Sequence, residues 1–305
     1  MIVVAGESLI DLVPQRAAVG GEALPPLLPR LGGGPFNTAV ALGRLGADVT
    51  FCSRVSTDGF GEALLDGLRA AGVGTSLVQR GPEPTTLAVA AIEADGSAGY
   101  GFYASGSADR LFALPPELPA GVEALALGTC SLVLEPGASA YEALLHREAA
   151  RGVFTLLDPN IRPGLISEPD AYRARFTRWL ASVTLLKVSE DDVKWLGGSP
   201  EEWLGLGPAA VVLTHGERGL TVYTRDGAEI SVPGVEVTVA DTIGAGDTVN
   251  AALLDDLARR AALASEALLS LGSAGWTEVL SFAARAAALT CARTGAEPPY
   301  ASDLR

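Results

Sequence analysis

Cysteine and lysine are scarce in this sequence, and each shortage argues against a class of protein. The 305 residues include three cysteines, Cys52, Cys130 and Cys291, an odd number without a Cys-x-x-Cys pair. This pattern disfavours a disulfide framework and predicts free, buried thiols. The lysines are Lys187 and Lys194, and neither follows a glycine, so a P-loop of the Gly-Lys-Ser/Thr type is absent.

Histidine is equally scarce. The two histidines, His146 and His215, lie far apart in the sequence, so no helical zinc-binding pair exists. No Gly-x-Ser-x-Gly elbow, the turn that exposes a nucleophilic serine, occurs either. The usual support for a metalloprotease or a serine hydrolase is therefore missing.

Long apolar runs and an excess of basic charge are also missing. No run of about eighteen uncharged apolar residues occurs, and the start, "MIVVAGESLIDLVP", lacks a basic signal-peptide region. We therefore expect a soluble, cytoplasmic protein without a membrane partner. The formal net charge of -14 argues against a nucleic-acid partner, which a basic patch would recognise.

Apolar residues are plentiful by contrast, and their spacing predicts the fold class. They make up 48% of the chain, enough for a large core, and no shift in composition marks a domain boundary, so we expect one domain over 1–305. Short β-branched runs such as "IVVAG" and "VFTLLDP" alternate with helical patterns such as "ASAYEALLHREAARG". This alternation predicts an α/β fold with a mostly parallel sheet covered on both faces, where ligands bind at the carboxyl ends of the strands.

Two segments interrupt the alternation. Residues 11–30 are rich in Pro and Gly, and "TTLAVAAIEADGSAGYGFYA" is typical of two strands joined at Asp95-Gly96. We expect the two segments, about 11–31 and 85–105, to form a small β-lid beside the main sheet. The alternative is an ordinary hairpin at the edge of that sheet.

The stretch "DTIGAGDTVNAALL" is typical of a site that binds and transfers an anion. Gly244 and Gly246 permit a sharp turn directly before an apolar helix. The amides of Gly244, Ala245, Gly246 and Asp247 would then face outward at the positive end of the helix dipole. Asp247 could accept a proton from a hydroxyl that attacks a phosphorus atom, while these amides stabilise the transferred group. The alternative is a plain turn with a capping carboxylate.

Polar residues follow several other predicted strands. "LGGGPFNTAVALGRLG" gives a second glycine turn before a helix, and "LLDPNIRPG" and "VVLTHGERG" each end a buried strand. Each taken singly is typical of a loop, but strand ends of one parallel sheet meet at one edge, so together they predict a single crevice. Its candidate residues are Asp11, Gly33, Gly34, Asn37, Asp158, Asn160, Arg162, Thr214, Gly216 and Gly219.

Together these motifs resemble the ribokinase-type (PfkB) carbohydrate kinases over the whole chain, and particularly their fructokinase branch. The shared features occur in order: "GESLIDLVP", "GGGPFNTAVALGRLG", "GFYASGSAD", "LDPNIRPGL", "LKVSEDD", "LTHGERG", "DTIGAGDTVNAALL" and "ALTCARTGAEPP". The resemblance implies a three-layer α/β/α sandwich with a small β-lid. It also implies a homodimer in many relatives, which nothing in this sequence decides.

The resemblance further implies a role for each candidate residue. Asp247 takes the position of the catalytic base, with Gly244, Ala245 and Gly246 as anion hole. Sugar-binding positions are Asp11, Gly33, Gly34, Asn37, Phe102, Asn160 and Arg162, and the last two also lie near phosphate. Nucleotide-binding positions are Lys187, Ser189, Thr214, Gly216 and Gly219. A monovalent cation, K⁺, is implied near Asp241 and Ile243.

The chain departs from the family pattern at two places. The Asn-x-x-Glu motif that organises Mg²⁺ through water becomes Ser189-Glu190-Asp191-Asp192, so Asp192 or Glu190 is the candidate metal residue, and a charged helix start is the alternative. In "FYASG", Ala104 stands where kinases of acidic sugars carry arginine. Without a cation for a substrate carboxylate the substrate is expected to be neutral, unless Arg110 or Arg162 substitutes.

The function expected from this resemblance is transfer of the γ-phosphoryl of ATP, with Mg²⁺, to a hydroxyl of a neutral sugar, with fructose as first choice. Alternatives are a kinase of 2-keto-3-deoxygluconate, ribose or a nucleoside, and a non-catalytic sugar- or nucleotide-binding protein on the same fold.

Overall fold

A computed structural model describes residues 1–14, 26–92 and 98–305. Within these residues the main sheet has nine strands in the order β13-β12-β11-β10-β9-β8-β1-β4-β5. The strands from β11 to β5 run parallel, whereas β12 and β13 pair antiparallel at one edge. Their bounds are β1 Ile2–Ala5, β4 Val49–Ser56, β5 Gly74–Gly81, β8 Ala124–Gly128, β9 Phe154–Asp158, β10 Leu185–Ser189, β11 Ala210–Thr214, β12 Leu220–Thr224 and β13 Glu229–Val232.

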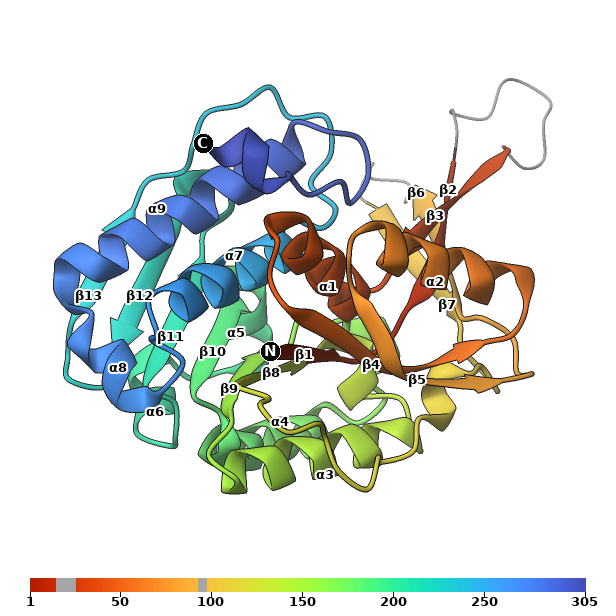
Figure 1. Ribbon diagram of the computed structural model, residues 1–305, viewed down its shortest axis with the longest axis horizontal. Coiled ribbons are helices and arrows are strands. Elements are labelled where there is room, and N and C mark those ends of the chain that lie inside the picture. Colours follow the sequence, from red (N-terminus) through yellow and green to blue (C-terminus); the bar gives the residue numbers. More distant parts are fainter. Residues whose placement is uncertain (15–25, 93–97) are drawn as a thin grey trace.

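Helices cover both faces of this sheet (Figure 1). Alternate residues of β1 show why: Ile2 and Val4 pack into the core beneath α1, α2, α7 and α9, while Val3 and Ala5 pack into a second core beneath α3 and α4. The predicted three-layer α/β/α sandwich is therefore confirmed. The helices are α1 Gly34–Leu45, α2 Gly59–Ala70, α3 Gly137–Ala150, α4 Pro169–Trp179, α5 Glu190–Leu196, α6 Pro200–Leu204, α7 Ala245–Arg259, α8 Ser265–Ser270 and α9 Gly272–Cys291. Short 3-10 helices are η1 Asp109–Leu111, η2 Thr129–Leu132, η3 Pro163–Leu165, η4 Leu180–Ser182, η5 Gly216–Arg218 and η6 Ala301–Leu304.

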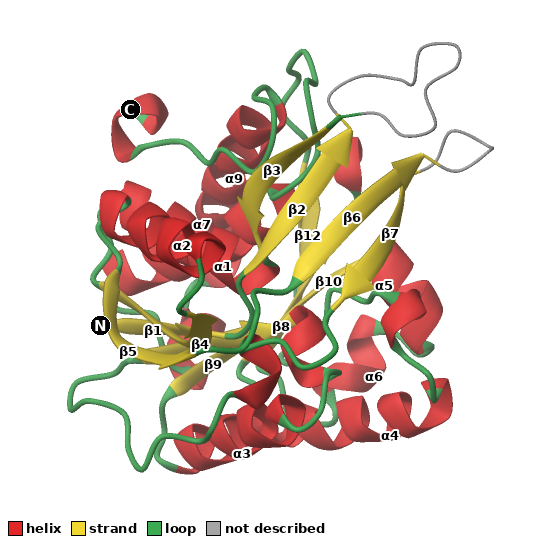
Figure 2. Cartoon of the chain, turned by 90° about the vertical axis from the view of Figure 1, so that its right-hand side faces the viewer, coloured by secondary structure: helices red, strands yellow, loops and turns green. Residues whose placement is uncertain are grey.

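A second, small sheet stands away from the main one (Figure 2). Among the described residues it has four strands in the order β3-β2-β6-β7, namely β3 Leu27–Gly32, β2 Leu9–Pro14, β6 Leu87–Ile92 and β7 Ala98–Tyr103. β2 pairs with β3 and β6 with β7 antiparallel, and the parallel pair of β2 with β6 joins the two hairpins. The expected strand pair is thus confirmed, and the edge-hairpin alternative is wrong because neither strand joins the main sheet. The predicted turn at Asp95-Gly96 lies outside the described residues.

The structure also bears on two features of the composition. All three cysteines are free, but only Cys52 and Cys130 are buried, because Cys291 lies partly exposed at the end of α9. Within the described ranges, none of the helices combines the length and apolar character that a membrane span requires.

Candidate active site

A cavity of about 630 Å³ lies where the carboxyl ends of the parallel strands face the small sheet. Leu9, Asp11 and Phe102 reach it from the small sheet, and the other lining residues come from the main domain. It collects most of the predicted site residues: Asp11, Gly33, Gly34, Asn37, Phe102, Asn160, Arg162, Lys187, Ser189, Glu190, Asp192, Thr214, Gly216, Ile243, Gly244, Gly246 and Asp247. The expectation of a single crevice is met by this geometry.

Four predicted residues do not line the cavity. Asp158, at the end of β9, lies behind its wall and accepts hydrogen bonds from Lys187 and Asn250. Ala245 lies between two lining glycines as the first residue of α7. Gly219 lies between η5 and β12 at a φ of 108°, and a Cβ there would stand 2.1 Å from the carbonyl oxygen of Val232, so packing alone explains this glycine. The carboxylate of Asp241 accepts hydrogen bonds from the amides of Ile243 and Gly295, at 3.0 and 2.9 Å, which points it into the loop.

Both glycines of the Gly-Ala-Gly turn at the start of α7 lie close to another part of the chain. Gly244 is left-handed, with a φ of 78°, and a Cβ would stand 2.7 Å from the Cβ of Ala296. A Cβ on Gly246 would stand 2.9 Å from the Nζ of Lys187. The N–H of Ala245 makes a 3.3 Å bond to the carbonyl of Thr242, while the following amides, like those at any helix start, have no acceptor inside the helix. The turn therefore presents backbone donors and a fixed ammonium side by side.

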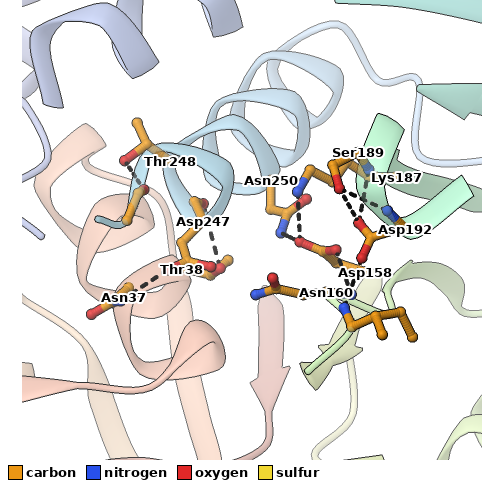
Figure 3. A network of polar contacts seen from close by, with 12 residues as sticks. Asn37, Thr38, Asp158, Asn160, Lys187, Ser189, Asp192, Asp247, Thr248 and Asn250 are labelled. Atoms are coloured by element: carbon orange, nitrogen blue, oxygen red, sulfur yellow. Dashed lines mark hydrogen bonds and ion pairs between the residues drawn. The ribbon is translucent and has the colours of Figure 1, made fainter. Parts of the chain in front are cut away.

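Asp247 follows in the first turn of α7 and is 7% exposed. Its Oδ2 accepts a 2.8 Å hydrogen bond from Nδ2 of Asn37, which lies on α1 (Figure 3). Burial raises the pKa of Asp247 to about 7, and the negative charge of Asp158 adds to this increase. The hydrogen bond from Asn37 and the positive charges of Lys187 and Arg162 lower the pKa and offset part of the increase. A carboxyl with a pKa near 7 can accept a proton at neutral pH.

Lys187, Asp158 and Asn250 form a buried group beside this carboxylate (Figure 3). Oδ2 of Asp158 receives Nζ of Lys187 at 2.9 Å and Nδ2 of Asn250 at 2.7 Å, from β10 and α7 respectively. Burial opposes the charge of Lys187, but Asp158 and Asp192 outweigh it and raise the pKa of the lysine. Lys187 therefore stays a cation inside the cavity wall.

The acidic segment Ser189-Glu190-Asp191-Asp192, after β10, forms the start of α5. A charged helix start was the alternative to a metal-binding role for this segment. Oδ2 of Asp192 accepts from the N–H and Oγ of Ser189, at 2.8 and 2.7 Å, as a capping box of α5. Its Oδ1 accepts from the amide of Ile161 at 2.7 Å, which ties the loop after β9 to α5. Glu190 accepts from His215 at 2.9 Å and pairs with Arg218. Both carboxylates still border the cavity.

The side of the cavity near the small sheet carries Asp11 and Arg162. Burial raises the pKa of Asp11 to about 6, and the charge of Arg162 opposes this. Nη1 of Arg162 donates to Oδ1 of Asn160 at 2.6 Å, and Asn160 itself has a left-handed φ of 38°. Arg110 is directed elsewhere, since its guanidinium donates to the carbonyls of Glu135 and Ala104 and does not line the cavity. Arg162 therefore remains the substitute cation considered from the sequence.

Several lining residues were not singled out from the sequence. Glu7, Thr129, Cys130 and His215 border the cavity, and Asn250 lies directly behind it. Glu7 had a usable signal, because "GESLIDL" places a carboxylate between two apolar segments directly after a strand. Asn250 lies inside the apolar helix of "DTIGAGDTVNAALL", where its side chain has no polar neighbour pattern, whereas Thr129 directly follows a strand, a signal that could have selected it.

Comparison with known proteins adds an independent observation. The model of the family described as "pfkB family carbohydrate kinase" matches residues 1–303. A fructokinase of Rhizobium leguminosarum bv. trifolii is 40% identical over 265 residues, which are 84% of this chain and 79% of that relative. Among solved structures, a fructokinase of Xylella fastidiosa with bound ATP superimposes with a TM-score of 0.86 at 27% identity, over 99% of this chain and 96% of that one. A fructokinase variant of Vibrio cholerae O395 with fructose, ADP and potassium ion gives 0.82 at 27% identity, over 97% and 93%.

Proposed function

The chain belongs to the pfkB family of carbohydrate kinases and is a sugar kinase, and from this premise we propose that it transfers the γ-phosphoryl of ATP to a hydroxyl of fructose. The named relatives are fructokinases, and one solved relative holds ATP while another holds fructose and ADP. The expectation of a cytoplasmic enzyme is part of the same proposal.

One observation supports the proposed chemistry: Asp247 borders the same cavity as Asp11 and Asn37 and lies in the first turn of a helix whose N-terminal end, at Gly244 and Gly246, also lines that cavity. In a protein that only stored an anion, this carboxylate would repel the ligand at short range. In a phosphoryl transfer it is useful, because a hydroxyl must lose a proton as its oxygen attacks phosphorus.

The proposed steps use this chain's residues as follows. Asp11 and Asn37 hold the sugar, and Asp247 accepts the proton of the attacking hydroxyl. The new bond joins that oxygen to the γ-phosphorus, the bond from phosphorus to the β,γ-bridging oxygen breaks, and ADP leaves with the electron pair. The amides at the start of α7 and the ammonium of Lys187 stabilise the charge on the transferred group.

Mg²⁺ fits this site as an ion that arrives with the nucleotide. In the part of the chain that the structure describes, no cluster of three or more His, Cys, Asp or Glu side chains could bind a metal. Asp192 and Glu190 border the cavity with their oxygens already hydrogen-bonded, so they would hold the ion through water. Mg²⁺ prefers phosphate oxygens and water, and it would supply neutralisation of the triphosphate.

K⁺ is proposed at the loop of Asp241 and Ile243, by analogy with the potassium ion of the Vibrio cholerae relative. The two hydrogen bonds to Asp241 shape this loop directly before the α7 turn. A cation there would act on the amides of α7 through the conformation of the turn.

A neutral sugar is favoured by the absence of an arginine at Ala104, which is buried, and by the direction of Arg110 away from the cavity. We further propose that the small sheet acts as a lid over the sugar, because Asp11 and Phe102 reach the cavity from it. Closure would exclude water and so limit hydrolysis of ATP.

A homodimer is also part of the proposal. Size-exclusion chromatography with light scattering measures the oligomeric state.

A substrate panel tests this function. Purified protein with ATP and Mg²⁺ is assayed by coupled ADP formation on fructose, glucose, ribose, a nucleoside and 2-keto-3-deoxygluconate. We expect the highest kcat/KM with fructose and loss of the signal in excess EDTA. If another sugar gives product and fructose gives none, that sugar takes the place of fructose as the proposed substrate. If a sugar binds tightly but none of the compounds gives product, the chain is a binding protein and the proposed function is wrong.

The activity should depend on pH through Asp247. Its pKa is raised to about 7, so a growing fraction of the base is protonated as the pH falls through that value. We expect kcat/KM for the sugar to fall about tenfold per pH unit well below pH 7 and to level off above it. A pH profile from 5.5 to 9 measures this, with the coupling enzymes controlled separately; a flat profile down to pH 5.5 would contradict the assignment.

A further inference from the structure

Glu7 is a cavity-lining carboxylate that has no part in the transfer described above. It is 3% exposed and lies in the short link between β1 and β2, where the chain leaves the main sheet for the small sheet. Buried carboxylates are rarely retained without a partner or a function. Its contacts show what this one does.

Both oxygens of Glu7 are bonded to the segment that follows β8, the neighbour of β1 in the main sheet. Oε1 accepts from the hydroxyl of Thr129, and Oε2 accepts from the hydroxyl of Ser131 and, at 3.0 Å, from its amide. The amide of Glu7 in turn donates to Oγ of Ser131 at 2.9 Å. The carboxyl group therefore closes a ring of hydrogen bonds between the start of η2 and the link to the small sheet.

Thr129 adopts a backbone conformation that a threonine avoids. Its φ is 59°, in the left-handed region, where a β-branched residue is strained. Such a conformation costs on the order of 1–3 kcal/mol and persists only where the surroundings hold it. The bond from its hydroxyl to Glu7 is one of the contacts that hold it.

The Thr129 side chain stands beside the proposed base. The point where a Cβ on Gly34 would lie is 2.6 Å from Cγ2 of Thr129, 3.4 Å from its Oγ1 and 3.3 Å from Oδ1 of Asp247. Thr129 and Asp247 thus flank the same glycine, and all three residues line the cavity. The wall against which the reacting end of a sugar would rest includes this strained threonine.

We propose that Glu7 is a positioning residue of the sugar subsite: through its bonds to Thr129 and Ser131 it holds the Thr129 side chain as a fixed wall beside Gly34 and Asp247. The inference rests on the proposed sugar-kinase function. It assigns to Glu7 an effect on the sugar and on the attacking hydroxyl, and none on the nucleotide.

The chemistry of Glu7 suggests which substitution separates its roles. Burial raises its pKa, the bonds from Ser131 and Thr129 oppose this, and the nearby Asp109 adds to it, so hydrogen bonding rather than charge is the useful property of the group. In Glu7→Gln the amide oxygen can accept from Ser131 and the NH₂ can donate to the hydroxyl of Thr129. Glu7→Leu has a similar volume but leaves both partners unpaired.

The test compares steady-state kinetics of the intact enzyme on the sugar that the wild type phosphorylates. For Glu7→Leu we expect the sugar KM to rise about tenfold or more and kcat to fall, with the ATP KM within about twofold of wild type. Glu7→Gln should recover most of both losses. A wild-type sugar KM in Glu7→Leu would overturn the inference, whereas a wild type that phosphorylates no sugar would overturn the proposed function itself.

Asp109 provides the matched control. It is also buried and accepts from two hydroxyls, Thr86 at 2.5 Å and Ser107 at 2.6 Å, at the base of the β6–β7 hairpin, but it does not line the cavity. Asp109→Leu should lower the thermal stability much as Glu7→Leu does and leave the sugar KM near wild type. Equal changes of sugar KM in both variants would reduce Glu7 to a general stabilising role.

Thr129→Gly keeps the inference testable even if Glu7→Leu does not fold. Glycine adopts a φ of 59° without strain, which offsets part of the cost of the lost hydrogen bond to Glu7, so we expect the variant to fold with a melting temperature at or somewhat below that of wild type. The sugar KM should nevertheless increase as in Glu7→Leu, because the wall is gone. Unchanged sugar kinetics in Thr129→Gly would refute the role of this side chain.

Discussion

Asp247→Asn should lower kcat by at least about 10³-fold while the KM values for sugar and ATP stay within a few-fold of wild type. The asparagine keeps the shape of the residue and an oxygen for the 2.8 Å bond from Asn37, but it cannot accept the proton of the attacking hydroxyl. Single-turnover and steady-state assays with coupled ADP detection measure the effect.

The same substitution should also stabilise the fold at alkaline pH. The carboxyl pKa is raised from 3.8 to about 7, so the buried charged form costs folding free energy once the pH exceeds the folded value, at about 1.4 kcal/mol per pKa unit. Stability from the protonated form is present below pH 3.8 and is lost as the pH rises through about 7. Thermal unfolding at pH 8 should thus show a higher melting temperature for Asp247→Asn.

Asp255 is the control for the kcat measurement on Asp247→Asn. It lies on the same helix, is buried, and burial raises its pKa to about 6, but its ion-pair partner is Arg259 at the far end of α7. Asp255→Asn should leave kcat unchanged. Near-normal turnover of Asp247→Asn would remove Asp247 from the role of base.

Lys187→Met should damage both stability and turnover. Its ammonium is the ion-pair partner of Asp158, with both side chains at most 5% exposed, so its loss leaves a buried charge unpaired at a cost of about 3–5 kcal/mol. The ammonium also lies 2.9 Å from the point where a Cβ of Gly246 would stand, next to the amides proposed to hold the transferred phosphoryl group. We expect kcat/KM for ATP to fall about 10²-fold or more.

A double variant separates the two effects of Lys187. Lys187→Met with Asp158→Asn removes both charges and should recover much of the lost stability in chemical denaturation. Activity should stay low, because the phosphoryl group still lacks its cation. Recovery of activity together with stability would mean that Lys187 serves only to neutralise Asp158.

Much of the fold was accessible from the sequence because it depends on local patterns. The spacing of apolar residues predicts strands such as "VFTLLDP" and the helix of "TVNAALLDDL". A parallel sheet then brings the carboxyl ends of such strands together. The same kind of pattern predicted Asp247 at the start of a helix beside backbone amides, with a plain turn and a capping carboxylate as the alternative.

The rest of the site depends on contacts between distant segments. Glu7 and Ser131 are 124 positions apart in the sequence. The left-handed backbone of Thr129 depends on such long-range contacts, and the residues next to it in the sequence do not predict it. For Gly219 the sequence suggested a role that the structure does not require. A glycine in a loop after a strand is compatible with ligand binding, but the close carbonyl of Val232 is enough to explain why this residue has no side chain. Asp192 similarly caps α5, a role that its place in an acidic run did not distinguish from metal binding.

The close approach of Gly244 to Ala296 has a consequence for biosynthesis. The amides of Ala240 and Asp241 donate to the carbonyl of Cys291, and Asp241 accepts from Gly295, so the turn before α7 is supported by a segment about fifty residues later. A ribosome-bound chain that ends before that segment lacks these contacts to its glycine turn. We therefore expect the nascent polypeptide to become competent for phosphoryl transfer only after residues 291–296 have been translated and have docked.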